Sequence, residues 1–389
     1  MSEQKEKRNS YHGFEQGPIR PPSEALSLLI RVTRNCPWNR CSFCPVYKHA
    51  KFSVRSVEHV KQDIDSVHRH VEALRETPRG SNRIRPTCVS EVTGNSLPGE
   101  SQAFAAAFQW LFAGGMRSVF LQDADALVIK PANMMSILAH LKKRFPFVER
   151  ITSYSRSTTI ASRKDSDLED MRNAGLNRIH IGLESGSDRI LEMVNKGATR
   201  DKQIIAGLKV KRAGIELSEY VMPGLGGRDL SKIHALSTAD ALNEIDPDFI
   251  RMRTLAIPRH SPLFQEYKAG RFAKCTDRMV AEEILMFIER LEGITSVITS
   301  DHILNLFGDL EGTLPHDKER MIGMLRAYLA MGSEDQRLYQ VGRRLGVFSC
   351  IGDMEDPHRL STAEKAYREL GVTPDNVDEI TDELMTRYI

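Results

Sequence analysis

Segments with strand patterns alternate with segments with helix patterns along most of this chain, and this alternation constrains the fold more than any other feature. Amphipathic helix patterns, several of them closed by glycine, separate short apolar or alternating runs. Because strands that alternate with helices form parallel sheets through right-handed βαβ units, we expect an α/β fold. Periodicity does not decide whether the sheet closes. The six predicted strands are Ala25–Arg34, Ser118–Ile129, Glu149–Ser157, Arg178–Ser185, Ile215–Gly227 and Asp248–Pro258.

The two ends of the chain differ from this alternating middle part. Residues 1–24 are polar and predict a disordered or extended N-terminus, while strand patterns fade after about Leu263 and amphipathic helix patterns follow. We therefore expect an α/β domain over residues 25–264 and a helical C-terminal extension over residues 265–389. Within the domain, Glu76–Glu100 is rich in Pro, Gly, Asn, Ser and Thr and predicts one long loop.

The charge of the chain is close to balanced. Its 389 residues include 54 basic and 52 acidic side chains, which gives a net charge of +2. This balance argues against a dedicated nucleic-acid-binding or membrane-surface protein, although a local basic patch is compatible with it. The N-terminal residues lack the apolar stretch of a signal peptide, and no run approaches about 18 apolar residues. We therefore expect a cytoplasmic protein without a membrane partner.

Three of the six cysteines, Cys36, Cys41 and Cys44, lie within nine residues directly after the first predicted strand. In a reducing compartment such a group indicates metal or redox chemistry rather than a disulfide framework. Three thiolates suit one face of a cubane iron–sulfur cluster, and Phe43 with its apolar neighbours would shield that cluster from water. His49 could instead complete a zinc site with three cysteines and one histidine.

The other cysteines, Cys88, Cys275 and Cys350, are scattered along the chain. Their expected role is that of buried or idle thiols, because no further close-set cysteines accompany them. Cys88 lies in the long predicted loop, where a role as hydrogen donor is also conceivable.

Polar residues and a glycine lie at the carboxyl ends of the other predicted strands, where the functional groups of parallel sheets collect. Each also has a purely structural interpretation: a solvated turn for the aspartates, a helix N-terminal residue for the glutamate, an ordinary turn for the glycine, and surface positions for the arginines. In chain order these residues are Asp123 and Asp125, Arg156, Glu184 and Ser185, Gly224, and Arg251 with Arg253.

The cysteine loop after the first strand, with Phe43 just before the last cysteine, resembles the radical S-adenosylmethionine (SAM) superfamily. A second segment, Arg178–Gly207, ends its strand in Gly-Leu-Glu-Ser. It is similar to the fourth strand and following helix of the oxygen-independent coproporphyrinogen dehydrogenases, the methylthiotransferases and the elongator acetyltransferase. One departure is plain: four residues separate Cys36 from Cys41, whereas the usual spacing in the superfamily is C-x3-C-x2-C.

The resemblance implies a (β/α)6 partial TIM-type barrel and a [4Fe–4S] cluster whose fourth iron is left for the amino and carboxylate groups of SAM. Phe43 would lie beside this cluster. The implied cluster ligands are Cys36, Cys41 and Cys44. The implied SAM contacts are Glu184 with Ser185 at the ribose hydroxyls, Asp123 or Asp125 at the amino group, Gly224 near the adenine, and Arg156, Arg251 or Arg253 at the carboxylate.

The activity implied by this resemblance is reductive cleavage of SAM. An electron from a donor such as ferredoxin or flavodoxin would enter the cluster, and SAM would be cleaved to methionine and a 5′-deoxyadenosyl radical. The radical would remove a hydrogen atom from a substrate that the sequence does not identify. No cobalamin-binding or RNA-binding appendage is recognisable, so a nucleic-acid partner is not indicated. The competing interpretation is a non-catalytic zinc or iron–sulfur protein that uses the same cysteines, with or without His49.

Overall fold

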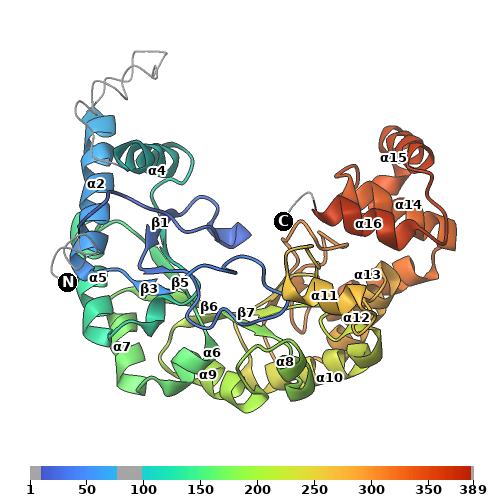
Figure 1. Ribbon diagram of the computed structural model, residues 1–389, viewed down its shortest axis with the longest axis horizontal. Coiled ribbons are helices and arrows are strands. Elements are labelled where there is room, and N and C mark those ends of the chain that lie inside the picture. The colour runs from blue at the N-terminus through green and yellow to red at the C-terminus, as the bar shows by residue number, and fades with distance from the viewer. Residues whose placement is uncertain (1–9, 77–98, 387–389) are drawn as a thin grey trace. The chain divides into compact units, whose positions relative to one another are not determined.

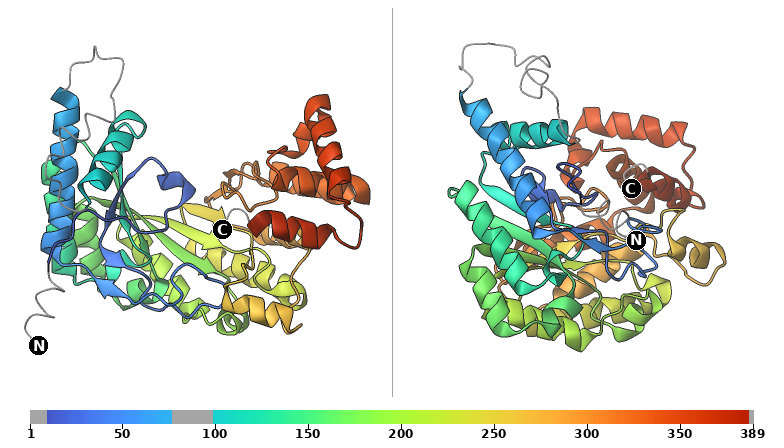
Figure 2. Two further views of the ribbon diagram at one scale, coloured as in Figure 1. Left: turned by 45° about the horizontal axis from the view of Figure 1, so that its top comes forward. Right: turned by 60° about the vertical axis from the view of Figure 1, so that its left-hand side comes forward.

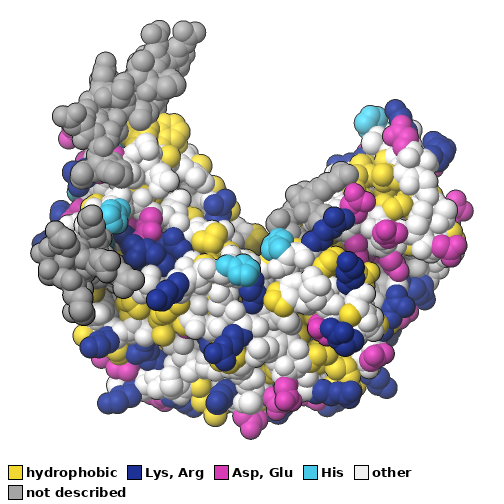
Figure 3. Space-filling view, in the orientation of Figure 1, with side chains coloured by type: hydrophobic (Ala, Val, Ile, Leu, Met, Phe, Trp, Pro, Cys, Tyr) yellow, Lys and Arg dark blue, Asp and Glu magenta, His cyan; other side chains and the backbone are white. Residues whose placement is uncertain are grey.

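The computed structural model describes residues 10–76 and 99–386. It divides the chain into two compact units, and none of its described helices is long and apolar enough to cross a membrane. On the face shown in Figure 3, basic and acidic side chains are interspersed. The first unit comprises Met1–Pro37, His49–Ile179 and Arg212–Ile215, and the second comprises Trp38–Lys48, His180–Lys211 and Glu216–Ile389.

Parallel strands form the centre of the first unit, and their side chains are almost wholly buried. Leu28 of β1 pairs with Val119 of β4, and Ser118 of β4 pairs with Arg150 of β5. Helix α2 packs against α4 and α5 beside these strands (Figure 1). The elements are η1 (Pro22–Glu24), β1 (Leu28–Arg31), β2 (Thr33–Arg34), β3 (Ser53–Val54), α2 (Val57–Glu76), α4 (Glu100–Phe112), β4 (Ser118–Gln122), η2 (Ala126–Val128), α5 (Pro131–Arg144), β5 (Arg150–Ser155), α6 (Ser157–Ser162) and α7 (Asp165–Asn173).

The second unit also has a layer of helices on a parallel sheet. Tyr220 of β7 pairs with Arg251 of β8, and β8 in turn pairs with β9. Helices α10 and α12 pack against each other beside these strands (Figure 2). The elements are α8 (Asp188–Met193), β7 (Glu216–Val221), α10 (Gly227–Ile245), β8 (Phe249–Met252), α11 (Pro262–Lys268), α12 (Asp277–Arg290), β9 (Val297–Thr299), β10 (Gly312–Thr313), α13 (Lys318–Ala330), α14 (Ser333–Arg344), η3 (Ile351–Glu355), α15 (Pro357–Glu369) and α16 (Val377–Thr386).

Two elements have residues in both units, namely β6 (Leu176–Glu184) and α9 (Arg200–Arg212). The main sheet has the strand order β1-β4-β5-β6-β7-β8-β9-β10. Its first six strands follow one another in chain order with helices between them, as in a (β/α)6 partial TIM-type barrel. The predicted α/β fold class is therefore confirmed.

Several details of the strand prediction were wrong. The predicted strand Ala25–Arg34 is divided, because β1 joins the main sheet while β2 pairs with β3 in a separate two-stranded sheet. Three predicted strands are too long, since β4 ends at Gln122, β7 at Val221 and β8 at Met252, whereas the predicted ends were Ile129, Gly227 and Pro258. The short strands β9 and β10 lie in the part expected to be helical. The predicted domain boundaries at residues 24 and 264 stay predictions.

The C-terminal helices have a core of their own within the second unit. Val341 of α14 packs with Val372 and with Val377, the first residue of α16. An aromatic group precedes it, in which the ring of Phe307 lies 5.1 Å from that of Tyr328 and 6.3 Å from that of Tyr339, measured between centroids. Burial of these large apolar side chains stabilises the helical part.

Candidate functional site

The cysteine loop is fixed to the segment that follows α8. Trp38 donates from Nε1 to the carbonyl oxygen of Asn195 at 2.8 Å, and the backbone N–H of Ser42 donates to Val194 at 2.9 Å. The indole ring lies directly over Gly197, where any Cβ would clash with it and where φ is +68°. Glycine is therefore required at position 197 by both space and backbone conformation.

The three thiols of the loop are partly exposed, and none forms a disulfide. Lys48 secures the loop internally by donating from Nζ to the carbonyl oxygens of Asn39, at 3.0 Å, and Cys41, at 2.9 Å. Within residues 10–76 and 99–386, no three His, Cys, Asp or Glu side chains are gathered in a metal-binding arrangement. The donor set itself fits an iron–sulfur cluster, because thiolate is the ligand such clusters prefer. Cluster binding stays a prediction.

Asp123 holds the beginning of this loop in the first unit. Its Oδ2 accepts from the guanidinium of Arg31 at 2.8 Å and from the backbone N–H of Asn35 at 3.2 Å, one residue before Cys36. Asp123 is fully buried, and its pair with Arg31 is largely shielded from water. A buried carboxylate with charged and backbone donors strongly fixes the position of the chain at residue 35.

Asp125 has a different set of partners, all around the end of β5. Its carboxylate accepts from Ser155 Oγ at 2.9 Å, from Thr159 Oγ1 at 2.6 Å and from the backbone N–H of Arg156 at 3.3 Å. Burial raises the pKa of Asp125, and these hydrogen bonds partly oppose the rise. The contacts turn the chain away from the sheet after Gln122, which explains why the predicted strand was too long.

Glu184 lies at the end of β6 with its backbone in the left-handed region, at φ +63°. Its carboxylate accepts from Lys196 Nζ at 3.0 Å, and the same ammonium lies 6.0 Å from the ring centroid of Phe43. Lys196 therefore connects the cysteine loop with the predicted ribose-binding carboxylate. Ser185 is buried, and its hydroxyl accepts from the backbone N–H of Ser187 at 3.2 Å.

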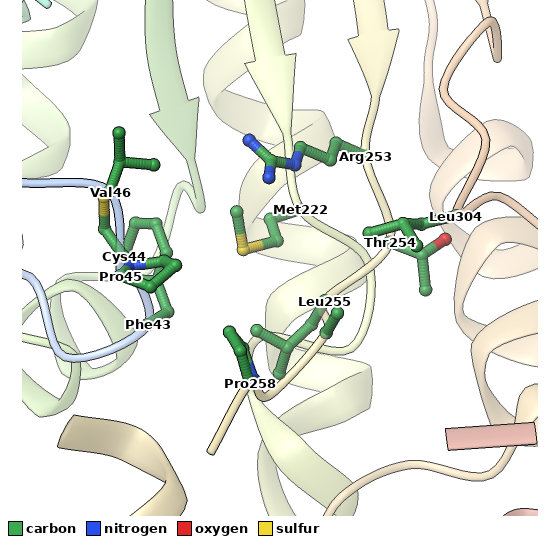
Figure 4. A pocket seen from close by; sticks show the side chains of 11 residues that line it. Phe43, Cys44, Pro45, Val46, Met222, Arg253, Thr254, Leu255, Pro258 and Leu304 are labelled. Atoms are coloured by element: carbon green, nitrogen blue, oxygen red, sulfur yellow. The ribbon is translucent and has the colours of Figure 1, made fainter. Parts of the chain in front are cut away.

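A pocket in the second unit opens beside Cys44. The cysteine loop forms one wall, and the segments that follow β7 and β8 form the others (Figure 4). Its lining is mostly apolar, and Arg253 extends its guanidinium toward the wall that contains Cys44 (Figure 4). The lining residues are Phe43, Cys44, Pro45, Val46, Met222, Arg253, Thr254, Leu255, Ala256, Pro258 and Leu304.

The two arginines of β8 and its following loop differ in their partners. Arg251 is buried, pairs with Asp301 at 2.7 Å and donates to Ser218 Oγ at 3.2 Å. Arg253 has no carboxylate within ion-pairing distance among the residues that the structure describes. Burial and the charge of Arg253 lower the pKa of His302 to about 4, so this neighbour is neutral near pH 7. Arg253 is the better placed of the two to bind an anion from solution.

The remaining predicted positions are distributed as follows. Gly224 has φ +86° in the turn after β7, and its backbone N–H donates to Glu283 Oε1 at 2.7 Å. Arg156 is the N-cap residue directly before α6, in the first unit. His49 is exposed. Cys275 is buried, and burial raises its pKa to about 12, which keeps it an unreactive thiol. Cys88 lies outside the described residues.

Comparison with known proteins reveals a similarity to one family. Residues 101–237 match the family model described as the radical SAM superfamily. The predicted resemblance is thereby confirmed over this part of the chain, and the superfamily is one of enzymes. The match begins within α4 and ends within α10, so it includes Glu184 but not the cysteine loop.

Relatives of this chain include two archaeal proteins. It is 23% identical to a tRNA uridine(34) acetyltransferase of Methanocaldococcus jannaschii over 109 residues, which is 28% of this chain and 20% of that protein. It is 22% identical to the enzyme of the same description from Methanocaldococcus infernus over 121 residues, 31% of this chain and 23% of that protein. The chain thus spans about a fifth of the length of these relatives. Coproporphyrinogen III oxidase from Escherichia coli is a similar solved structure, with 13% identity, a TM-score of 0.43 and coverage of 68% of this chain and 52% of that one.

Several polar residues near the candidate site could not be identified as site residues from the sequence. Lys196, His234 and Glu283 come from α8, α10 and α12 or their flanking loops, and each contacts Glu184 or the turn at Gly224. Of the three, only Lys196 has a local signal in the sequence, since it directly precedes Gly197, a residue type typical of a tight turn. His234 and Glu283 lie 49 residues apart, so only the packing of α10 on α12 brings them together.

Proposed function

We propose that the chain binds a [4Fe–4S] cluster and SAM, and that it cleaves SAM reductively. The observation that carries this proposal is the pocket beside Cys44, which combines a predicted cluster ligand, the aromatic Phe43 and the guanidinium of Arg253. When bound, the reduced cluster supplies the electron that splits SAM into methionine and a 5′-deoxyadenosyl radical, which removes a hydrogen atom from the substrate.

The residues of the chain would bind and orient these groups. Cys36, Cys41 and Cys44 would hold three irons. Arg253 would bind the carboxylate of SAM, because a guanidinium forms strong charge-assisted hydrogen bonds to a carboxylate where apolar walls exclude water. Glu184 would accept from the two ribose hydroxyls, with Lys196 fixing its orientation.

The substrate is a separate question, to which the relatives give a first answer. Both are described as acting on uridine 34 of tRNA. Transfer RNA is therefore the first substrate to test. If a tRNA is the substrate, adding it should make the cleavage of SAM faster than in its absence. It should also yield a modified nucleoside that is detectable by mass spectrometry.

Anaerobic purification and reconstitution test the proposal. The reconstituted protein should be brown, bind about four irons per chain, and give a reduced-state EPR signal that changes when SAM is added. With a strong reductant it should release 5′-deoxyadenosine, which is measured by chromatography. Failure to release it would refute SAM cleavage.

Cysteine variants provide the matched controls. Cys36→Ala, Cys41→Ala and Cys44→Ala should each lose the cluster, whereas Cys275→Ala and Cys350→Ala should retain about four irons. A colourless protein with one zinc that depends on the same loop would support the competing interpretation of a structural zinc site. A brown protein that never responds to SAM would support an electron-transfer role instead.

A further inference from the structure

A buried polar cluster on α10 and α12 contacts the backbone of Glu184. His234 of α10 contacts Glu283 of α12 at 2.8 Å, measured from Nδ1 to Oε1. Ser231, one turn before His234, donates its hydroxyl to Oε2 of the same carboxylate. All three side chains are buried, with exposed fractions of 7% or less.

The cluster extends to two loops that follow strands of the sheet. His234 Nε2 lies 3.0 Å from the carbonyl oxygen of Glu184, and Gly224 donates its backbone N–H to Glu283 Oε1 at 2.7 Å. Because a carbonyl oxygen only accepts, the Nε2 of His234 must carry a proton. One side-chain pair therefore contacts both the end of β6 and the turn after β7.

The Glu184 backbone needs such support. Its φ of +63° is a conformation that residues other than glycine adopt rarely, and surrounding contacts must stabilise it. Two donors share its carbonyl oxygen: His234 Nε2, and the backbone N–H of Met222 at 3.1 Å. The rotation that places this carbonyl also sets the direction of the Glu184 side chain.

We infer that His234 and Glu283 are positioning residues, which hold the Glu184 backbone and the Gly224 turn in the arrangement that binds the adenosine part of SAM. This inference rests on the proposed function. The pair does not touch SAM; it acts through the two loops. Its loss should therefore weaken SAM binding even where the fold is retained.

The first unit contains a matched cluster that serves as a control. Ser66 and His70 of α2 contact Glu100 of α4, at 3.0 Å and 2.7 Å. In the described part of the chain, the hydrogen bonds to the Glu100 carboxylate all come from α2. This cluster joins two helices and holds no loop at a strand end. It has the same residue types but, on this inference, no part in SAM binding.

Four variants of the reconstituted full chain test the inference: His234→Asn, His234→Gln, Glu283→Gln and His70→Asn. The amide of asparagine can reach the position of Nδ1 but not that of Nε2, whereas glutamine can donate from near Nε2. We expect His234→Asn and Glu283→Gln to raise the KM for SAM about tenfold, the effect of losing one buried hydrogen bond. We expect His234→Gln to regain most of this loss, and His70→Asn to keep the KM within about twofold of the unchanged protein.

Thermal unfolding of the same variants separates positioning from general stability. The inference holds if His234→Asn and His70→Asn lower the melting temperature by similar amounts while only His234→Asn raises the KM. It is overturned if both leave the KM unchanged, or if His234→Gln is no better than His234→Asn. If the unchanged protein itself neither binds nor cleaves SAM, the proposed function fails, and the inference fails with it.

Discussion

Lys196 and Glu184 form an ion pair of 3.0 Å, between Nζ and Oε1, in which both side chains are nearly buried at 12% and 13% exposed. The ammonium also faces the ring of Phe43, two residues after Cys41. This pair therefore joins the cysteine loop to the end of β6. Partial burial makes such a pair stronger than one on the open surface.

Replacing Lys196 tests what the ammonium does for Glu184. We expect Lys196→Met to weaken SAM binding about fivefold, because the Glu184 carboxylate loses the partner that fixes its orientation. Lys196→Arg should retain most of the affinity. Isothermal titration calorimetry of the reconstituted protein gives the dissociation constants. Tighter binding by Lys196→Met would instead mean that the ammonium competes with the ribose.

The two aspartates can be distinguished by paired amide variants. Asp123→Asn should reduce the iron content after reconstitution and destabilise the fold by about 2 kcal/mol, because the largely buried Arg31 keeps only its longer ion pair with Glu15, at 3.6 Å. Asp125→Asn should destabilise by about 1–2 kcal/mol through lost hydrogen bonds to Ser155 and Thr159, with full iron content. Urea unfolding and iron analysis measure both effects. Equal iron content in the two variants would contradict the assignment of Asp123 to the cysteine loop.

Arg251 and Arg253 should respond in opposite ways to substitution. Arg253→Gln is expected to weaken SAM binding at least tenfold and to leave stability almost unchanged, because this side chain faces the pocket. Arg251→Gln is expected to lower stability by about 2–3 kcal/mol through its lost contact with Asp301, with a smaller effect on SAM. If Arg251→Gln alone abolished SAM binding, the carboxylate would have been assigned to the wrong arginine.

The buried carboxyl group of Glu219 should make the stability of the folded chain depend on pH. Burial raises its pKa well above the ordinary value of 4.5; the charge of Lys196 opposes the rise and that of Glu184 adds to it. The folded chain thus keeps this proton to a higher pH than the unfolded chain. The stability it contributes is present below pH 4.5 and is lost as pH rises through the raised pKa.

Glu219→Gln removes this titration and provides the test. We subtract the free energy of unfolding of the unchanged protein from that of the variant. This difference should increase steadily between about pH 5 and pH 8. Urea unfolding at several pH values measures the difference. A constant difference across this range would show that Glu219 is not protonated in the folded chain.

The sequence predicted the fold class and the place of the site, for local reasons. Strand and helix periods are properties of short windows, so the α/β alternation could be read residue by residue. Polar residues at the carboxyl ends of strands, from Asp123 to Arg253, followed from the same pattern. The strand predicted through Asp125 failed because its end depends on hydrogen bonds to Ser155 and Thr159, which are 30 and 34 residues away.

By itself, then, the sequence determined the parallel α/β architecture, the group of three cysteines and the resemblance to the radical SAM superfamily, because each depends on residue type and spacing along the chain. Only the tertiary structure decided which partners each polar group has. It paired Arg251 with Asp301 and left Arg253 at the pocket, and it joined Glu184 to Lys196 and His234. Side chains from separate helices and loops meet only after the chain has packed, so no local pattern contains these contacts.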